Sequence, residues 1–490
     1  MSMLAIKPTA HIVDVLGNVI GRDQPILRIE KALEIVALLG EEIFADDNVI
    51  FFDPFCKAGE LLLACAFHSC WAKAKDNPKL LDTDMVFKEI YESSRYFGLA
   101  PDERHHRLSI RTFLGNTRSH NENFNHIIRN GHYLSEEDGT LDKKEFERKF
   151  NSMIGYINSK ARNKKIIAVG NPPYQEADGG FGKSAKAVYG YFVDFVEKYV
   201  SDENISIKEW LFVIPARWFG GGKGLDDFRA DLITSHKIKN LVYFQNSSHV
   251  FPTVDINGGV CYLHYDKNHT GKTTFTDGNH TEILHLDEYD IIADDPKGYD
   301  IVRKVMSQWN REVISDVALA RKAFGIPTNY FDKNESEDPK KVECYPCLNK
   351  GRSVKYIKKS EITKNKNKVD LWKVAVPKAA GGSKGKRRST IPINQIFLID
   401  KGMVTTETYN IIDCFETKAE AEKLISYLKT DFARYLLGLR KITQDLPADR
   451  WAWVPYVDLS KNWDDEKLYS HFDLSKLDQK HIRGKIEEWT

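Results

Sequence analysis

The sharpest chemical feature of the sequence is the run Asn171-Pro172-Pro173-Tyr174, which follows Gly170 at the end of an apolar segment. The two prolines restrict the backbone and leave the Pro172 carbonyl without a helical or sheet partner. The Asn171 side-chain oxygen and this carbonyl can then accept two hydrogen bonds from one amino group, which raises the nucleophilicity of a planar nitrogen. Tyr174 offers a ring on which a base can stack. The alternative interpretation is a plain proline-rich turn at a strand exit.

A second run, Asp53-Pro54-Phe55-Cys56-Lys57-Ala58-Gly59-Glu60, directly follows the apolar stretch 48–52. A turn of small residues between a strand and a helix lets a nucleoside cofactor approach the backbone closely. The acid at the strand end, Asp53, can hold the ammonium group of such a cofactor. Taken alone, the run more often marks a structural turn.

Both runs sit where strands are expected to end. Apolar runs that predict buried strands occupy residues 48–52, 166–169, 210–214 and 240–244. A helix is predicted over 26–43 from the spacing of its apolar residues. Strands that alternate with helices through 45–265 predict an α/β doubly wound sheet. Ligands bind at the carboxyl ends of the strands in such sheets, so the two runs are placed for a shared site.

Composition excludes several classes of protein. The 490 residues are 42% hydrophobic and 29% charged, which predicts a globular chain of two or three domains. We find no apolar window of membrane-spanning length, and we expect no signal peptide. The seven cysteines are scattered, which favours a reducing, cytoplasmic location. Cys344 and Cys347 lack a second pair at metal-ligand spacing, so we expect no metal site.

Basic residues are concentrated in one segment of the chain. Residues 340–388 hold 16 Lys and Arg against three acids, although the whole chain has a formal charge of +1. A basic block on an otherwise acidic protein is typical of contact with a phosphate backbone. The alternative is a solvated, unstructured run of like charges.

The two runs, in this order on an α/β framework, resemble the DNA N6-adenine methyltransferases of bacterial restriction–modification systems. The resemblance is to the NPPY class with gamma-type motif order and a C-terminal target-recognition domain. Further similar segments are Arg95–Ser109, Leu114-Gly115-Asn116, Phe251-Pro252 with the residues that follow, and the stretch 454–474. The similarity covers most of 45–270 and extends more loosely over 300–490.

The resemblance implies the fold and its division. Residues 1–270 would form a Rossmann-like, S-adenosylmethionine-dependent catalytic domain. Residues 271–300 would form a linker. Residues 301–490 would form a mixed α+β DNA-recognition domain with a C-terminal helical tail. Duplex DNA would lie between the two domains.

The resemblance also implies an activity: transfer of a methyl group from S-adenosylmethionine to N6 of an adenine flipped out of a specific DNA sequence. Double-stranded DNA is the expected substrate, and a cognate restriction endonuclease is an expected companion. The implied catalytic residues are Asn171, Pro172, Pro173, Tyr174 and Phe251, the last stacking on the flipped base. The implied cofactor-binding residues are Asp53, Phe55, Cys56, Lys57, Gly59, Asp102, Asn116 and Asn171.

The sequence departs from the family pattern at two positions. Lys57 stands where the family has the first glycine of its cofactor loop, so Lys57→Gly is expected to be tolerated or to tighten cofactor binding. Ala100 stands where the family has its ribose-binding acid, two residues after Gly98, and Asp102 can substitute from the adjacent turn. Two other functions stay open: an RNA-base or glutamine methyltransferase, and a DNA-binding specificity protein with a degenerate cofactor site.

Within the basic block, Lys384, Lys386, Arg387 and Arg388 lie in a Gly- and Ser-rich stretch that predicts a mobile loop. We expect this loop to order against DNA. The two lysines are assigned to phosphates, and Arg387 or Arg388 is the candidate for reading a base.

Overall fold

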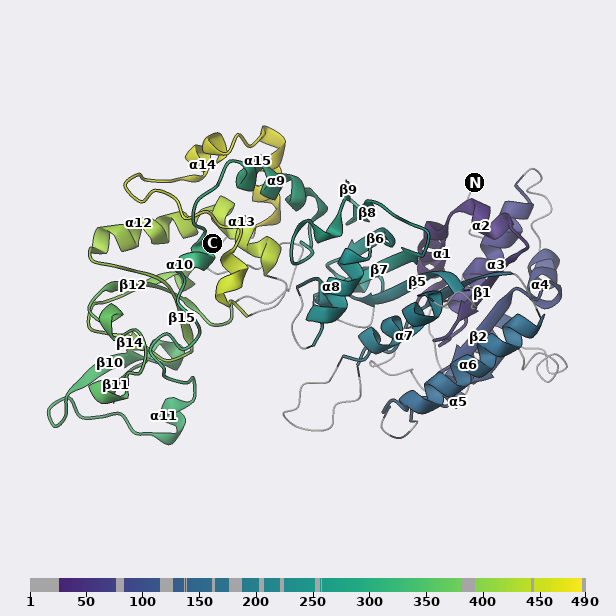
Figure 1. Cartoon of the computed structure of the whole chain (residues 1–490), viewed down its shortest axis with the longest axis horizontal. Helices are drawn as coiled ribbons and strands as arrows, with labels where there is room; N and C mark the ends of the chain where they lie inside the picture. The colour runs from purple at the N-terminus through teal and green to yellow at the C-terminus, as the bar shows by residue number, and fades with distance from the viewer. Residues whose placement is uncertain are drawn as a thin grey trace. The chain divides into compact units, whose positions relative to one another are not determined.

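The computed structural model describes residues 26–75, 83–114, 127–135, 137, 139–160, 164–175, 187–201, 207–220, 224–251, 256, 258–380, 393–441 and 445–486. The chain divides into two compact units, Met1–Asp290 and Ile291–Thr490, called unit 1 and unit 2 here. Their elements are labelled in Figure 1.

Unit 1 is organised around one nine-stranded sheet with the order β3-β2-β1-β4-β5-β7-β6-β8-β9. The strands are β1 Val49–Asp53, β2 Tyr96–Ala100, β3 Ile128–Asn130, β4 Lys165–Gly170, β5 Ile207–Pro215, β6 Ile238–Phe244, β7 Val260–Asp266, β8 Thr273–Thr276 and β9 Thr281–Leu284. Strands β3, β2, β1, β4 and β5 pair in parallel, whereas β7 is antiparallel to both β5 and β6. The strand order reverses between β1 and β4, which makes their shared end a ligand-binding position.

Helices cover both faces of this sheet. They are α1 Ile29–Val36, α2 Glu41–Ala45, α3 Glu60–Lys73, α4 Thr83–Glu92, α5 Glu103–Leu114, α6 Lys143–Lys160, α7 Tyr189–Ser201 and α8 Asp226–Thr234. Side chains alternate across a strand. Val49 and Phe51 of β1 therefore join the core formed with α1, α2 and α3. On the other face Phe52 packs on Phe150 of α6, with ring centroids 5.4 Å apart. This three-layer arrangement confirms the expected doubly wound α/β class (Figure 1).

Residues 271–300 were expected to form a linker, but part of this stretch belongs to the sheet of unit 1. Thr273 and Phe275 of β8 alternate with outward-facing residues and are buried, and β8 pairs in parallel with β6. β9 then returns antiparallel to β8. The polar character of this stretch suggested a linker, but its alternation belongs to a half-buried edge hairpin. The boundary between the compact units falls at residues 290 and 291.

Unit 2 is a mixed α+β unit, as expected. Its strands form two three-stranded sheets, β11-β10-β14 and β13-β12-β15. The strands are β10 Cys344–Leu348, β11 Val354–Lys358, β12 Trp372–Pro377, β13 Phe397–Ile399, β14 Val404–Thr405 and β15 Tyr409–Phe415. The helices are α9 Pro296–Ser307, α10 Ile314–Val317, α11 Tyr330–Lys333, α12 Lys418–Leu428, α13 Asp431–Arg440, α14 Asp465–His471 and α15 Lys476–Lys485. In the described residues of either unit, no helix combines the length and apolar character needed to span a bilayer.

Candidate functional site

The two runs singled out in the sequence meet at one edge of the sheet. β1 ends at Asp53 and β4 ends at Gly170, and the two strands are parallel neighbours. The approach is close: a Cβ added to Gly170 would lie 2.7 Å from Cδ2 of Phe55 and 3.4 Å from Oδ1 of Asp53. Glycine is therefore required at position 170 for the two runs to pack together.

The turn after β1 is held by buried acids. Asp53 is 2% exposed, and its Oδ1 accepts a hydrogen bond of 2.9 Å from the Phe55 amide. Glu60, at the start of α3, accepts from the Ala58 amide at 3.1 Å and from the Leu27 amide at 3.2 Å. Burial, with a contribution from the Glu60 carboxylate, raises the pKa of Asp53 well above its usual range. A cationic group beside Asp53 would therefore be strongly favoured.

The glycine that this turn requires is Gly59. It adopts φ 77°, the left-handed conformation, immediately before α3. A Cβ there would lie 3.0 Å from the Ser109 carbonyl oxygen and 3.1 Å from Cβ of Phe113. Lys57 is not among the described residues with positive φ. Its side chain therefore adds no backbone strain at the position where the family has glycine.

Asn171, Pro172, Pro173 and Tyr174 are all buried at the end of β4. Asn171 is 2% exposed, and the Tyr174 carbonyl accepts from the Val188 amide at 3.1 Å. Phe251, 1% exposed, lies beside Tyr174 with the ring centroids 6.2 Å apart and the ring planes at 71°. The structure thus brings together the two rings assigned to a flipped base. They meet edge to face, so at least one must turn before a base can stack between them.

Lys57 connects the two runs. Its side chain is 1% exposed, and its Nζ lies 5.4 Å from the centroid of the Tyr174 ring. This Nζ has no hydrogen-bond partner among the described residues. Burial lowers the pKa of Lys57 to about 7, against the opposing effect of the carboxylates of Glu60, Asp53 and Asp102. The nearby carboxylates therefore do not compensate fully for its desolvation.

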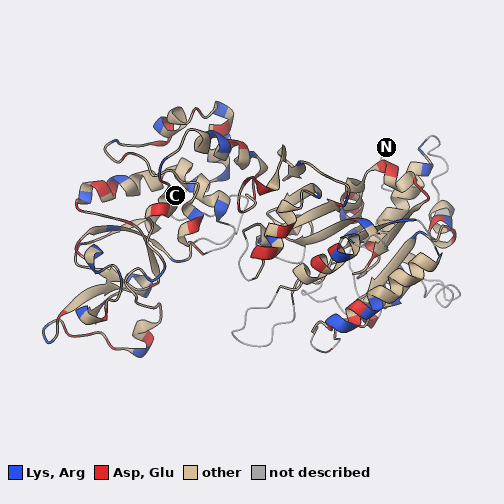
Figure 2. Ribbon diagram, viewed as in Figure 1, with Lys and Arg blue, Asp and Glu red and all other residues tan. Residues whose placement is uncertain are grey.

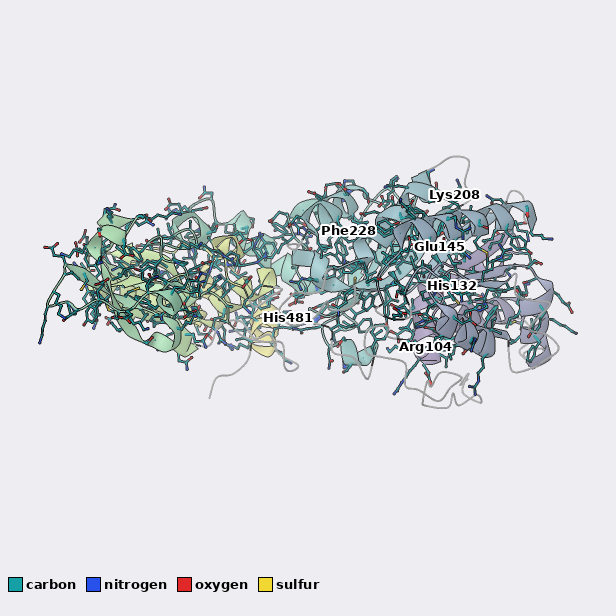
Figure 3. The ribbon with its side chains drawn as sticks, turned by 90° about the horizontal axis from the view of Figure 1, so that it is seen from below. Arg104, His132, Glu145, Lys208, Phe228 and His481 are labelled. Atoms are coloured by element: carbon teal, nitrogen blue, oxygen red, sulfur yellow. The ribbon has the colours of Figure 1, made fainter. Side chains whose placement is uncertain are left out.

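Asp102 follows β2 at the neighbouring strand end. Its Oδ1 accepts from both the amide and the Nδ1 of His105 at 2.8 Å. Burial acts to raise the pKa of Asp102, but the hydrogen bonds from His105 outweigh it. The charge of Arg104, which is labelled in Figure 3, adds to the lowering of this pKa. Asp102 is thus a stable anion at the place where the ribose-binding acid was expected.

Three residues support the site although the sequence assigned them no role in binding or catalysis. Tyr133 is fully buried and donates through its hydroxyl to the Pro54 carbonyl at 3.0 Å, which supports the turn after β1. Glu60 joins this turn to the segment before α1, and His105 orients Asp102. Nothing in the local sequence marks Tyr133, because its partner lies far away along the chain. Glu60 was visible as an acid at a helix start.

Several predicted residues fall outside the described part of the chain. They are Asn116, Lys384, Lys386, Arg387 and Arg388, together with Pro252 beside Phe251. Their assignments stay predictions.

Acids compensate part of the positive charge in the described part of the basic block. Five lysines form ion pairs, namely Lys341, Lys350, Lys358, Lys359 and Lys378. Their partners Asp332, Glu337 and Glu407 lie outside the block, so the fold mixes the two signs of charge that the sequence separates, as Figure 2 shows over unit 2. Lys364 and Lys366 are exposed and form no ion pair with a described acid.

Another lysine of the block is structural. Lys373 is fully buried, and its Nζ donates to the carbonyls of Val369, Leu371 and Asp400 at 2.6, 2.8 and 3.3 Å. It is therefore unavailable to a phosphate. One group of metal-ligating composition occurs in the described residues, His236, His285 and Asp287, with ligand atoms within 4.8 Å of one another. It uses none of the residues of the two runs.

The chain resembles known methylases over the part that holds this site. Residues 94–251 match the model of the Eco57I restriction-modification methylase family. The family resemblance is confirmed. The match includes the run 171–174 and ends at Phe251, and the turn 53–59 precedes it.

A relative in Mycoplasma pneumoniae (strain ATCC 29342 / M129 / Subtype 1), an "uncharacterized adenine-specific methylase", is 32% identical over 136 residues. The aligned part is 27% of this chain and 29% of that relative's length. Among solved structures, the Type IIL restriction-modification enzyme MmeI in complex with DNA matches 97% of this chain and 74% of its own. Its TM-score is 0.50 at 12% identity, which shows a shared fold.

The first prediction concerns the turn itself. Gly59→Ala should destabilise the chain by about 1–3 kcal/mol, because the left-handed backbone and the contact with Ser109 both disfavour a Cβ. The matched control is Gly155→Ala, in α6, where an added Cβ meets nothing within 4 Å. Urea unfolding of both variants measures the difference. Equal stability of the two variants would show that this turn is not constrained as described.

Proposed function

We propose that this protein transfers a methyl group from S-adenosylmethionine to the exocyclic N6 of adenine in double-stranded DNA. We further propose that it serves as the modification part of a restriction–modification system. The observation that carries the proposal is the meeting of the turn after β1 with the buried run 171–174, at the point where the strand order reverses.

The residues at this edge fit S-adenosylmethionine. Asp53 is a buried carboxylate for which a cationic partner is favourable, and it is assigned the cofactor's ammonium group. Asp102, held as an anion by His105 at the end of β2, is assigned the ribose hydroxyls. Gly59 keeps the turn free of a side chain that would prevent this packing. When bound, the cofactor supplies the electrophilic methyl group.

The residues after β4 fit the methyl acceptor. The Asn171 side chain and the Pro172 carbonyl are assigned to N6, whose lone pair they direct towards the methyl group. Tyr174 and Phe251 are assigned to the two faces of the base, which must leave the duplex to reach a buried site. These four residues position the nitrogen and exclude water. The proton that N6 loses needs no strong base among them.

Unit 2 is the proposed DNA-recognition part. Lys341, Lys350 and Lys359 pair with acids, but exposed ion pairs of this kind are weak and can be exchanged for phosphates. Lys364 and Lys366 are exposed in the described part of the block. The four basic residues at 384–388 remain the first candidates for phosphate or base contact. A cognate endonuclease is proposed on family resemblance alone.

Asn171→Ala tests the acceptor assignment. It should reduce the methylation rate by at least about 100-fold, because one well-placed contact in a preorganised site contributes roughly 3–4 kcal/mol to transition-state stabilisation. DNA affinity should stay nearly unchanged. The measurement is single-turnover methylation of duplex DNA, with DNA binding followed in parallel. More than about a tenth of the wild-type rate in the variant would refute the role.

Asp53→Ala tests the cofactor assignment. Loss of the charged partner of the ammonium group should weaken S-adenosylmethionine binding by about tenfold to a hundredfold. Asp227→Ala, at an exposed position at the start of α8, is the matched control and should bind as the wild type does. Isothermal titration calorimetry measures both. Unchanged affinity in Asp53→Ala would place the ammonium group elsewhere.

Single alanine variants of Lys384, Lys386, Arg387 and Arg388 test the DNA assignment. Loss of a phosphate contact should weaken binding to all sequences and reduce the salt slope by about one. Loss of a base-reading Arg should cost about 1–3 kcal/mol on the cognate site alone. DNA affinity against salt concentration distinguishes the two cases. If none of the four variants changes affinity or slope, the recognition surface lies elsewhere in unit 2.

A further inference from the structure

Lys57 is a buried basic side chain at the centre of the site, and its amino group lacks an acceptor. It is 1% exposed, and its Nζ has no hydrogen-bond partner among the described residues. Its nearest described aromatic contact is the face of Tyr174 at 5.4 Å. Burying an ammonium without a paired acceptor costs several kcal/mol. Such a group is retained where a ligand supplies the acceptor.

The neighbouring carboxylates do not supply it. Both oxygens of Glu60 accept from backbone amides, of Leu27 and Ala58. Asp53 accepts from the Phe55 amide, and Asp102 accepts from His105. No ion pair joins Lys57 to any of these carboxylates, although all three are near enough to influence its pKa.

The chemistry of the cofactor indicates which acceptor fits. In S-adenosylmethionine the ammonium and carboxylate groups are attached to one carbon, so their protein partners must lie side by side. Asp53 and Lys57 belong to the same turn, are an acid and a base, and are both buried. Asp53 is the anion for the ammonium group. Lys57 is then the cation for the carboxylate.

We propose that Lys57 binds the carboxylate of the cofactor's methionyl group and so selects for cofactors that carry it. This inference rests on the proposed function. It reverses the expectation that glycine at position 57 would be tolerated or would tighten binding. The backbone there does not need a glycine, and the lysine adds a charge contact that a glycine cannot make.

The electrostatics around Lys57 agree with this role. Burial lowers the pKa of Lys57 to about 7, and a bound carboxylate would oppose that effect. The groups that face Lys57 are Asp53 from β1, Glu60 from α3, Asp102 from the turn after β2 and Tyr174 from the segment after β4. These groups comprise three acids and a neutral ring, so Lys57 is the cation available for an anionic ligand group in the described site.

The test compares S-adenosylmethionine with its decarboxylated analogue, which keeps the sulfonium, the ribose and the adenine. Calorimetric titration of the full chain should show the wild type binding S-adenosylmethionine at least about tenfold more tightly than the analogue. Lys57→Met should reduce this preference to about twofold or less while binding the analogue as the wild type does. Lys57→Arg should keep the preference, and so should the control Lys144→Met, at an exposed position on α6.

The outcomes separate the inference from the proposed function. If the wild type binds both compounds equally, or Lys57→Met keeps the preference, then Lys57 does not bind the carboxylate. A Lys57→Met variant that keeps the preference but methylates DNA slowly would instead assign Lys57 to the target base, and this inference would fail. If the wild type binds neither compound, the proposed function fails as well. The wild-type comparison requires no variant, so misfolding of Lys57→Met would not obscure it.

Discussion

The parallel pairing of β1 with β4 is the constraint on which the rest of the site depends. Because the strand order reverses between them, their carboxyl ends face one edge without a crossover helix covering it. Two runs that lie far apart in the sequence are thereby placed within van der Waals contact, as the packing of Gly170 against Phe55 shows. A side chain at Gly170 or at Gly59 would disturb this packing. The chemistry proposed for this protein exists only while that contact holds.

The second property of the site is that the protein itself buries two ionisable side chains, those of Asp53 and Lys57. Desolvation raises the pKa of Asp53 and lowers that of Lys57, so both groups are less stable as ions in the free protein than in water. A zwitterionic ligand that presents an ammonium and a carboxylate would compensate both. The nearby Asp102 differs, because His105 already stabilises its anionic form. The site therefore contains one stabilised anion, Asp102, that can accept hydrogen bonds from hydroxyl groups. It also contains two groups, Asp53 and Lys57, whose charged forms require a partner.

The sequence predicted those parts of the structure that are encoded locally. The apolar runs at 48–52 and 166–169 are buried strands, and the chemistry-bearing residues follow them directly, so the fold class and the two runs could be recognised. The burial of Lys57 and the support from Tyr133 could not, because both depend on contacts between distant segments. The ion pairs within the basic block could not be predicted for the same reason, since acidic partners such as Asp332 and Glu407 lie before and after it.

The central claim is that the site formed after β1 and β4 moves a methyl group from S-adenosylmethionine to adenine N6 in duplex DNA. The most direct measurement incubates the purified chain with isotopically labelled S-adenosylmethionine and a mixture of duplex DNA sequences. The DNA is then digested, and the nucleosides are identified by mass spectrometry, with RNA and protein substrates in parallel. The account predicts label in N6-methyladenine from DNA alone, incorporated at least about 100-fold more slowly with Asn171→Ala. Label in RNA, protein or another nucleoside, or binding of the cofactor without transfer to any DNA, would contradict it.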